Sequence, residues 1–129
     1  MNHPEIDWLV WDQLIKDLGI TIDRPVNSLH PEHRSIRYPI NYGYVNGTLG
    51  ADAEEVDIFV GAAENGLVAA IFTTDFRKGD NELKLMYNCS PVEIYLVNGF
   101  INFDRNLMEG ELVLRLPMSE IWENFKRNQ

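Results

Sequence analysis

Four carboxylates lie close together near the middle of the chain: Asp52, Glu54, Glu55 and Asp57 fall within six residues. Carboxylates held this close repel one another unless solvent or a bound cation neutralises them. The cluster therefore has two interpretations, a solvated acidic turn or a cation site. An EF-hand is excluded, because its sixth loop position must be glycine and the sixth residue counted from Asp52 is Asp57.

The strand-like segments that follow extend this cluster. If residues 64–66 form a three-residue hairpin loop, Asp57 lies opposite Thr73. A second reversal after Asp75 places that residue opposite Asp80, and opposite residues on antiparallel strands share a face. This register predicts that Asp57, Asp75 and Asp80 gather at one sheet edge. Oxygen ligands without His or Cys favour Mg²⁺ or Mn²⁺ over Zn²⁺.

Periodicity indicates the elements that must position these side chains. An amphipathic helix is expected within residues 1–19, and a second helix after Pro117. The region 24–50 is predicted to be an ordered loop. Strands are predicted at 56–62, 67–74, 82–87, 92–98 and 111–116. The pattern favours one domain, residues 1–129, with a strand-rich barrel or curled sheet between two terminal helices.

Composition narrows the class of protein. The 129 residues carry a net charge of -9, which disfavours binding to nucleic acid or to an anionic membrane surface. No apolar run approaches the roughly 20 residues of a membrane span, and the first residues lack the order of a signal peptide, so a cytoplasmic protein is expected. The single Cys89 has only Asn88 and Ser90 beside it, which favours a packed thiol over a nucleophile.

Two blocks of sequence together resemble a known family. Tyr38-Pro39-Ile40-Asn41-Tyr42-Gly43-Tyr44 precedes Asp52-Ala53-Glu54-Glu55-Val56-Asp57. The soluble inorganic pyrophosphatases of the first, Mg²⁺-dependent family follow an aromatic-Pro-x-Asn-Tyr-Gly-Tyr segment with Asp-x-Asp-x-x-Asp, and the later pair Asp75 and Asp80 matches their next aspartates. The similarity covers roughly residues 23–84. It implies an α+β, mainly β fold: a small OB-like antiparallel β-barrel with N- and C-terminal helices.

The resemblance also implies roles for the acidic residues. Asp52, Asp57 and Asp80 match the carboxylates that hold the activating metal pair, with Asp75 as a further ligand. Glu54 matches the position of the candidate general base, although the family has aspartate there. The implied cofactor is Mg²⁺, with Mn²⁺ as the alternative, and the implied reaction is hydrolysis of pyrophosphate to two phosphates by a metal-activated water.

Three further residues are implied to bind substrate. Arg24 matches a phosphate-clamping arginine and Tyr42 a phosphate-binding phenol. The family's lysine two residues after the second late aspartate is replaced by Glu82, and Lys84, on the same strand face, substitutes for it. Family members often assemble, so a homo-oligomer is left open. Two alternatives remain: hydrolysis of another small phosphoanhydride, or a catalytically weak protein that binds metal or phosphate.

Overall fold

The computed structural model describes residues 3–50 and 54–127, so Asp52 lies outside the described residues. Each helix and strand of this part of the chain is short. In chain order they are α1 (Trp8–Leu18), β1 (Ile20–Arg24), β2 (Asn41–Val45), β3 (Asp57–Val60), β4 (Leu67–Asp75), β5 (Asp80–Tyr87), α2 (Pro91–Ile101), β6 (Met108–Leu114) and α3 (Met118–Arg127).

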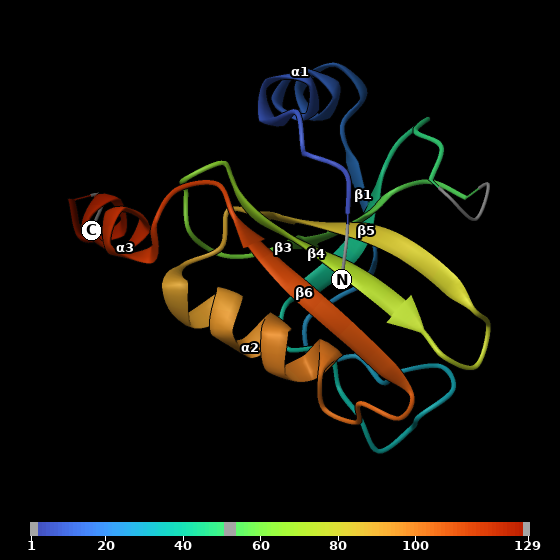
Figure 1. The fold of residues 1–129 in the computed structure, drawn as a ribbon. Helices are drawn as coiled ribbons and strands as arrows, with labels where there is room; N and C mark the ends of the chain where they lie inside the picture. Colours follow the sequence, from blue (N-terminus) through green and yellow to red (C-terminus); the bar gives the residue numbers. More distant parts are fainter. Residues whose placement is uncertain (1–2, 51–53, 128–129) are drawn as a thin grey trace.

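The strands form one mixed sheet in the order β1-β2-β3-β5-β4-β6 (Figure 1). Neighbouring strands are antiparallel except β3 and β5, which are parallel. The prediction of a mainly β α+β fold with terminal helices is confirmed, and the architecture matches the OB-like fold. The predicted closure into a barrel is wrong, because β1 and β6 remain at opposite edges, whereas the expected mostly antiparallel pairing is confirmed, with β3 and β5 as the parallel pair.

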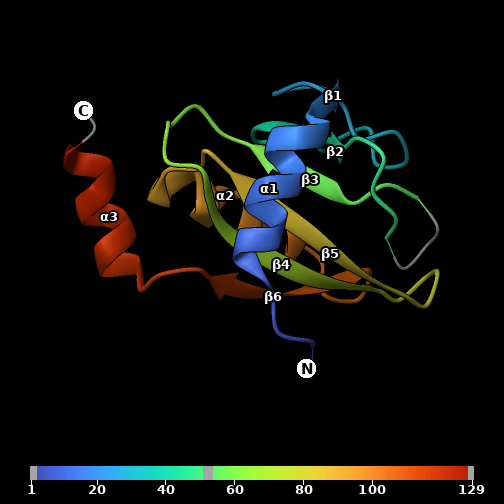
Figure 2. The same cartoon turned by 90° about the horizontal axis from the view of Figure 1, so that it is seen from above.

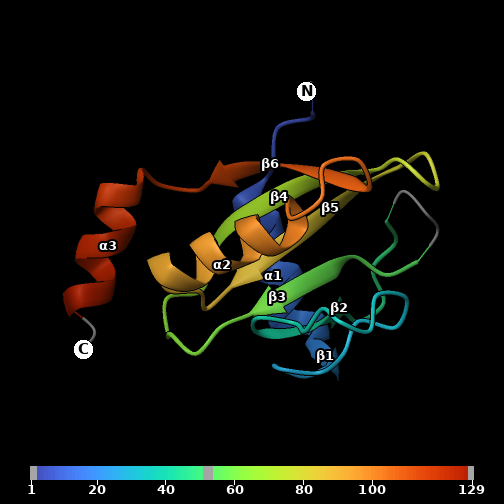
Figure 3. The ribbon, with the colours of Figure 1, turned by 90° about the horizontal axis from the view of Figure 1, so that it is seen from below.

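The sheet has a hydrophobic core on each face. Helix α1 covers one face, where Ile15 packs with Val45, Ile58 and Leu85. Helix α2 covers the other, where Ile94 and its neighbours pack with aromatic and aliphatic side chains of the sheet. Figure 2 shows α1 lying across the strands, and Figure 3 shows α2 on the opposite side with α3 beyond one end of the sheet. Both faces of the central strands are therefore buried.

Helix α2 replaces the strand predicted at 92–98. Ser90 and Glu93 form a reciprocal capping box around Pro91 at the start of the helix. Nearly every position of the segment is apolar, so its sequence has no clear period and looks like a buried strand. The capping residues, rather than the periodicity, carried the signal for a helix.

The predicted hairpin between β3 and β4 is also wrong. Strand β5 lies between them, and Asp57 pairs with Lys84 instead of Thr73. The first five residues of β4, Leu67–Ile71, are all buried, which requires a strand on each side and cover on both faces. Residues 61–66 accordingly turn around Asn88 after β5. The second reversal is confirmed, since Asp75 pairs with Asp80.

The segment 24–50, predicted as loop, contains β2 and an isolated bridge between Leu29 and Arg37. Tyr-Gly-Tyr gives β2 no alternation of apolar and polar residues. Gly43 instead allows close approach of β1: a Cβ built there would lie 1.8 Å from the carbonyl oxygen of Thr21. Among the described residues, no helix has the length and apolar character needed to cross a membrane.

Glycine substitutions test this packing. Gly43→Ala is expected to lower the free energy of unfolding by about 1–3 kcal/mol, as overpacking does, because β1 must move away. Gly99→Ala is the matched control: Gly99 lies within α2 with nothing within 4 Å of an added Cβ. That change is expected to raise stability by about 0.5–1 kcal/mol. Urea unfolding measures both, and equal effects would contradict the close approach of β1 and β2.

Candidate functional site

A cavity of about 390 Å³ lies on the α2 face of the sheet, where β2, β3 and β5 meet the hairpin after β4. We call it the site cavity. It is lined by side chains from seven regions of the chain (23–24, 30–32, 38–44, 54–59, 75–84, 100–101 and 108), which lie far apart in the linear sequence. The lining is Asp23, Arg24, His30, Pro31, Glu32, Tyr38, Tyr42, Tyr44, Glu54, Glu55, Asp57, Phe59, Asp75, Arg77, Lys78, Glu82, Lys84, Phe100, Ile101 and Met108.

The amino group of Lys84 is a buried charge in the lining of the site cavity. Its Nζ donates to Asp57 Oδ2 at 2.8 Å, to Tyr42 OH at 2.8 Å and to Glu82 Oε2 at 3.1 Å. The parallel register places Lys84 beside Asp57, and strand alternation puts Glu82 on the same face. These contacts account for the three donors of the ammonium group. We call this set of four side chains the Lys84 network.

Burial and charge act in opposite directions on this group. Burial alone lowers the pKa of Lys84, but its interactions with Tyr42, Asp57 and Glu82 outweigh burial, and the pKa lies above its ordinary value. Burial also raises the pKa of the Tyr42 phenol. At neutral pH the ammonium of Lys84 is therefore charged and Tyr42 is a neutral phenol.

Arg24 lies at the end of β1, opposite Tyr42 in the strand register. Its guanidinium carbon is 5.6 Å from the ring centroids of both Tyr38 and Tyr42, and its Nη1 donates to the Tyr38 hydroxyl. The two rings thus hold the guanidinium at the cavity wall. Because guanidinium has five donors in a planar fork, Arg24 retains the geometry to bind a phosphate oxygen.

Asp75 occupies the turn between β4 and β5. Its Oδ1 accepts hydrogen bonds from the backbone N–H groups of Arg77 at 3.0 Å and Lys78 at 3.3 Å. Burial raises the pKa of Asp75. The two hydrogen bonds and the nearby cations lower it by more than burial raises it, so the pKa lies below its ordinary value. Asp75 is consequently ionised at neutral pH.

The structure brings together only part of the predicted metal set. Asp57 and Asp75 line the site cavity, whereas Asp80, paired with Asp75 in the hairpin, is absent from its described lining. Glu54 is exposed at the cavity wall, and its backbone carbonyl accepts a hydrogen bond from Gly50 N–H at 2.6 Å. Over residues 3–50 and 54–127, no three His, Cys, Asp or Glu side chains are grouped as a metal site. The metal and catalytic roles therefore stay predictions.

The lining is nevertheless rich in carboxylates. Seven of its side chains are acidic (Asp23, Glu32, Glu54, Glu55, Asp57, Asp75, Glu82) and four are Lys or Arg (Arg24, Arg77, Lys78, Lys84). Some of this charge is paired internally, as in the 2.8 Å contact of Arg77 with Glu32. An excess of negative charge remains. This excess disfavours binding of a polyanion unless cations accompany it.

Sequence reasoning missed several lining residues. Glu82 carries a signal that could have found it, because it alternates with Asp80 and Lys84 along one strand. Tyr38 begins the recognised aromatic-Pro-x-Asn-Tyr-Gly-Tyr block but had no assigned role, yet its hydroxyl accepts from Arg24. His30 reaches the site cavity from a loop by stacking near Tyr38, at 5.8 Å between ring centroids. No spacing in the sequence indicates that contact.

Comparison with known proteins extends these observations. No family model matches the chain. No curated protein matches it either. Solved structures do. The inorganic pyrophosphatase of Helicobacter pylori aligns with a TM-score of 0.56 at 16% identity, over 84% of this chain and 90% of that one.

Two other pyrophosphatases give the same result. That of Coxiella burnetii aligns with a TM-score of 0.55 at 16% identity, over 85% of this chain and 94% of its own. That of Neisseria gonorrhoeae aligns with a TM-score of 0.56 at 15% identity, over 87% and 90%. At these identities the likeness establishes the fold alone. The chain has the fold found in inorganic pyrophosphatases.

Proposed function

We propose that the protein is a Mg²⁺-dependent hydrolase that converts inorganic pyrophosphate to two phosphates. The observation that carries this proposal is the lining of the site cavity, in which an excess of carboxylates surrounds a small set of cationic groups. Pyrophosphate is a polyanion, so a cavity of this charge suits it only when metal ions accompany it. The pyrophosphatase-like fold supports the same substrate at the level of architecture.

The chemistry of the lining fits Mg²⁺. Its acidic side chains offer oxygen donors, which Mg²⁺ prefers, while the single His30 offers little to Zn²⁺. We propose Asp52, Asp57, Asp75 and Asp80 as the residues that hold metal. Bound Mg²⁺ would neutralise phosphate charge and lower the pKa of a water molecule.

The remaining proposed roles follow from position and charge. Arg24, held between two tyrosine rings, binds a phosphate oxygen through its fork of donors. Tyr42, kept neutral by burial, retains a hydroxyl proton to donate. Lys84 binds phosphate only if one of its present acceptors releases it, and it meanwhile holds Asp57 in place. Glu54, at the exposed wall, accepts the proton of the attacking water as general base.

Metal binding is expected to raise the melting temperature, because it relieves repulsion among carboxylates only in the folded state. The measurement is thermal unfolding of one preparation in EDTA and in millimolar Mg²⁺. Asp57→Asn is expected to reduce this Mg²⁺-dependent shift, and Asp12→Asn is the control. Asp12 is paired with Arg115 on the α1 side of the molecule, outside the site cavity. Equal shifts in all three proteins would contradict a metal role for Asp57.

Phosphate release tests the substrate. With Mg²⁺, pyrophosphate is expected to be hydrolysed faster than nucleoside di- and triphosphates at equal concentration, because the site cavity has about 390 Å³ for substrate and metal together. Colorimetric phosphate detection measures this. Faster hydrolysis of a nucleotide would show that the substrate is another phosphoanhydride and not pyrophosphate. If no phosphate is released from any of these compounds, but Mg²⁺ still raises the melting temperature, the protein binds metal or phosphate without catalysing hydrolysis.

Glu54→Gln tests the proposed base. The change removes the proton acceptor with little change in size, so turnover of pyrophosphate is expected to fall by about 10²- to 10⁴-fold. Glu64→Gln is the matched control, since Glu64 lies in the loop between β3 and β4 and is outside the described cavity lining. The Mg²⁺ shift should persist in both variants. Wild-type turnover in Glu54→Gln would remove Glu54 from the mechanism.

A further inference from the structure

The carboxylates of Asp57 and Glu82 can be reached from both faces of the sheet. A second cavity, of about 600 Å³, lies on the α1 face beside β4 and β5. Glu55, Asp57 and Glu82 line both this cavity and the site cavity. The sheet is open there, because the pairing of β3 with β5 begins only at Asp57 and Lys84. The side chains of Asp57 and Glu82 are 28% and 22% exposed, so cations in solution have access to them.

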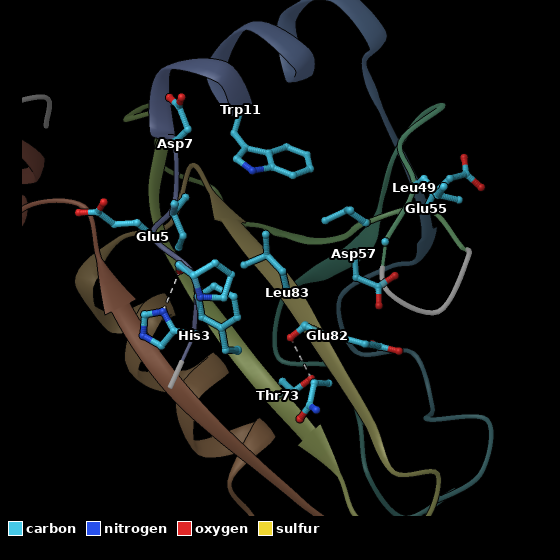
Figure 4. Close-up of a pocket in the computed structure, with 16 residues that line it drawn as sticks. His3, Glu5, Asp7, Trp11, Leu49, Glu55, Asp57, Thr73, Glu82 and Leu83 are labelled. Carbon is cyan, nitrogen blue, oxygen red and sulfur yellow. Dashed lines mark hydrogen bonds between the residues drawn. The ribbon is translucent and has the colours of Figure 1, made fainter. Parts of the chain in front are cut away.

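The two carboxylates also point to one place. Asp57 Oδ2 and Glu82 Oε2 lie 2.8 Å and 3.1 Å from the same nitrogen atom, Nζ of Lys84. Figure 4 shows the side chains of Asp57 and Glu82 turned to the same side, away from Leu83. Carboxylates that converge in this way repel one another unless a cation lies between them. The cation between them in this protein is the ammonium of Lys84, whose side chain is only 7% exposed.

The surroundings of this ammonium are those of a held ion. Its third contact, to Tyr42 OH at 2.8 Å, gives it oxygen neighbours from three strands. Divalent cations such as Mg²⁺ are also held by oxygen atoms that converge on one point, and a single position cannot hold both cations. Because all three N–H donors of Lys84 are paired, removing the ammonium would leave two carboxylates without a counter-charge. This cost opposes its displacement by metal.

We propose that Lys84 is a built-in cation that takes the place of one divalent metal ion between Asp57 and Glu82. This inference rests on the proposed function, because it concerns the number of metal ions in the site cavity. It assigns the carboxylate of Glu82 to Lys84 and not to metal. Metal that serves the proposed hydrolysis is held by the other carboxylates, together with Oδ1 of Asp57. The site cavity therefore binds one divalent ion fewer than its carboxylates would otherwise hold.

Replacement of the lysine tests this assignment. Lys84→Met removes the charge and keeps an unbranched, flexible side chain, and it is expected to bind one more Mn²⁺ per chain than the wild type. In the wild type that additional site is expected to be about 30-fold weaker, because a divalent ion about 4 Å from an ammonium in water is repelled twice as strongly as a unit charge. The electron paramagnetic resonance signal of free Mn²⁺ gives the number of bound ions. Equal numbers bound with equal affinity in both proteins would overturn the proposal.

Lys78→Met is the matched control. Lys78 also lines the site cavity, but its side chain is exposed, so solvent and salt screen its charge. This variant is expected to bind the same number of Mn²⁺ ions as the wild type. An equal gain in Lys78→Met and Lys84→Met would show a general effect of charge and would overturn the assignment of Lys84.

Glu82→Gln locates the ion and does not depend on the folding of Lys84→Met. With Lys84 present, this change is expected to leave the number of bound Mn²⁺ ions unchanged, because the amide oxygen still accepts from the ammonium. In the Lys84→Met background, the same change is expected to abolish the additional ion. Loss of an ion in Glu82→Gln alone would show that metal already uses Glu82. Retention of the additional ion in the double variant would place it elsewhere, and either result would overturn the proposal.

The Mn²⁺ measurements are made without pyrophosphate, so they separate this inference from the proposed hydrolysis. If the wild type releases no phosphate from pyrophosphate but Lys84→Met gains an ion that requires Glu82, the proposed hydrolysis fails and the assignment of Lys84 stands. If the wild type hydrolyses pyrophosphate and Lys84→Met gains no ion, only the assignment of Lys84 fails.

Discussion

The buried ammonium group of Lys84 is the constraint on which the centre of the molecule depends. A charge removed from water must be paired, because the loss of hydration otherwise costs more than packing returns. Three oxygen atoms from β2, β3 and β5 meet this requirement. The same contacts fix the parallel register of β3 on β5 and hold Asp57 at the cavity wall. The arrangement of the side chains at the site therefore depends on electrostatic pairing as well as on packing.

This constraint also determines how the site cavity can receive a ligand. Lys84 partly neutralises Asp57 and Glu82, so a metal ion at these carboxylates competes with an ammonium already in place. Arg24 differs, because it is held by aromatic rings and by one hydroxyl at the cavity wall. Displacing Lys84 would alter the buried network, whereas the proposed contact of a phosphate with Arg24 requires no such rearrangement.

The sheet order gives the two faces of the molecule separate cores and separate cavities. Helix α1 is anchored near its middle by a bidentate contact between Arg115 and Asp12, with oxygen–nitrogen distances of 2.8 and 2.9 Å. Helix α2 is anchored by its capping box. Strand β5 begins at Asp80, but β3 pairs with it only from Lys84 onward. The sheet is therefore incomplete beside Asp57. Three carboxylates, Glu55, Asp57 and Glu82, thus line cavities on both faces, which links the electrostatics of the two faces.

The sequence by itself determined the class of fold, the terminal helices, most strands and the hairpin that pairs Asp75 with Asp80. Each of these depends on local chemistry: periodicity, glycine turns or capping residues. The carboxylate cluster also indicated Asp57, whereas Arg24, Tyr42 and Lys84 were indicated only by the resemblance to a known family, and the roles of all four stay predictions. Only the tertiary structure decided that β5 separates β3 from β4. The physical reason is that strand pairing is non-local: burial of β4 on both faces favours two neighbouring strands, and no residue within residues 61–66 encodes which strand they are. The neighbours of Lys84, and with them the form of the site, follow from that choice.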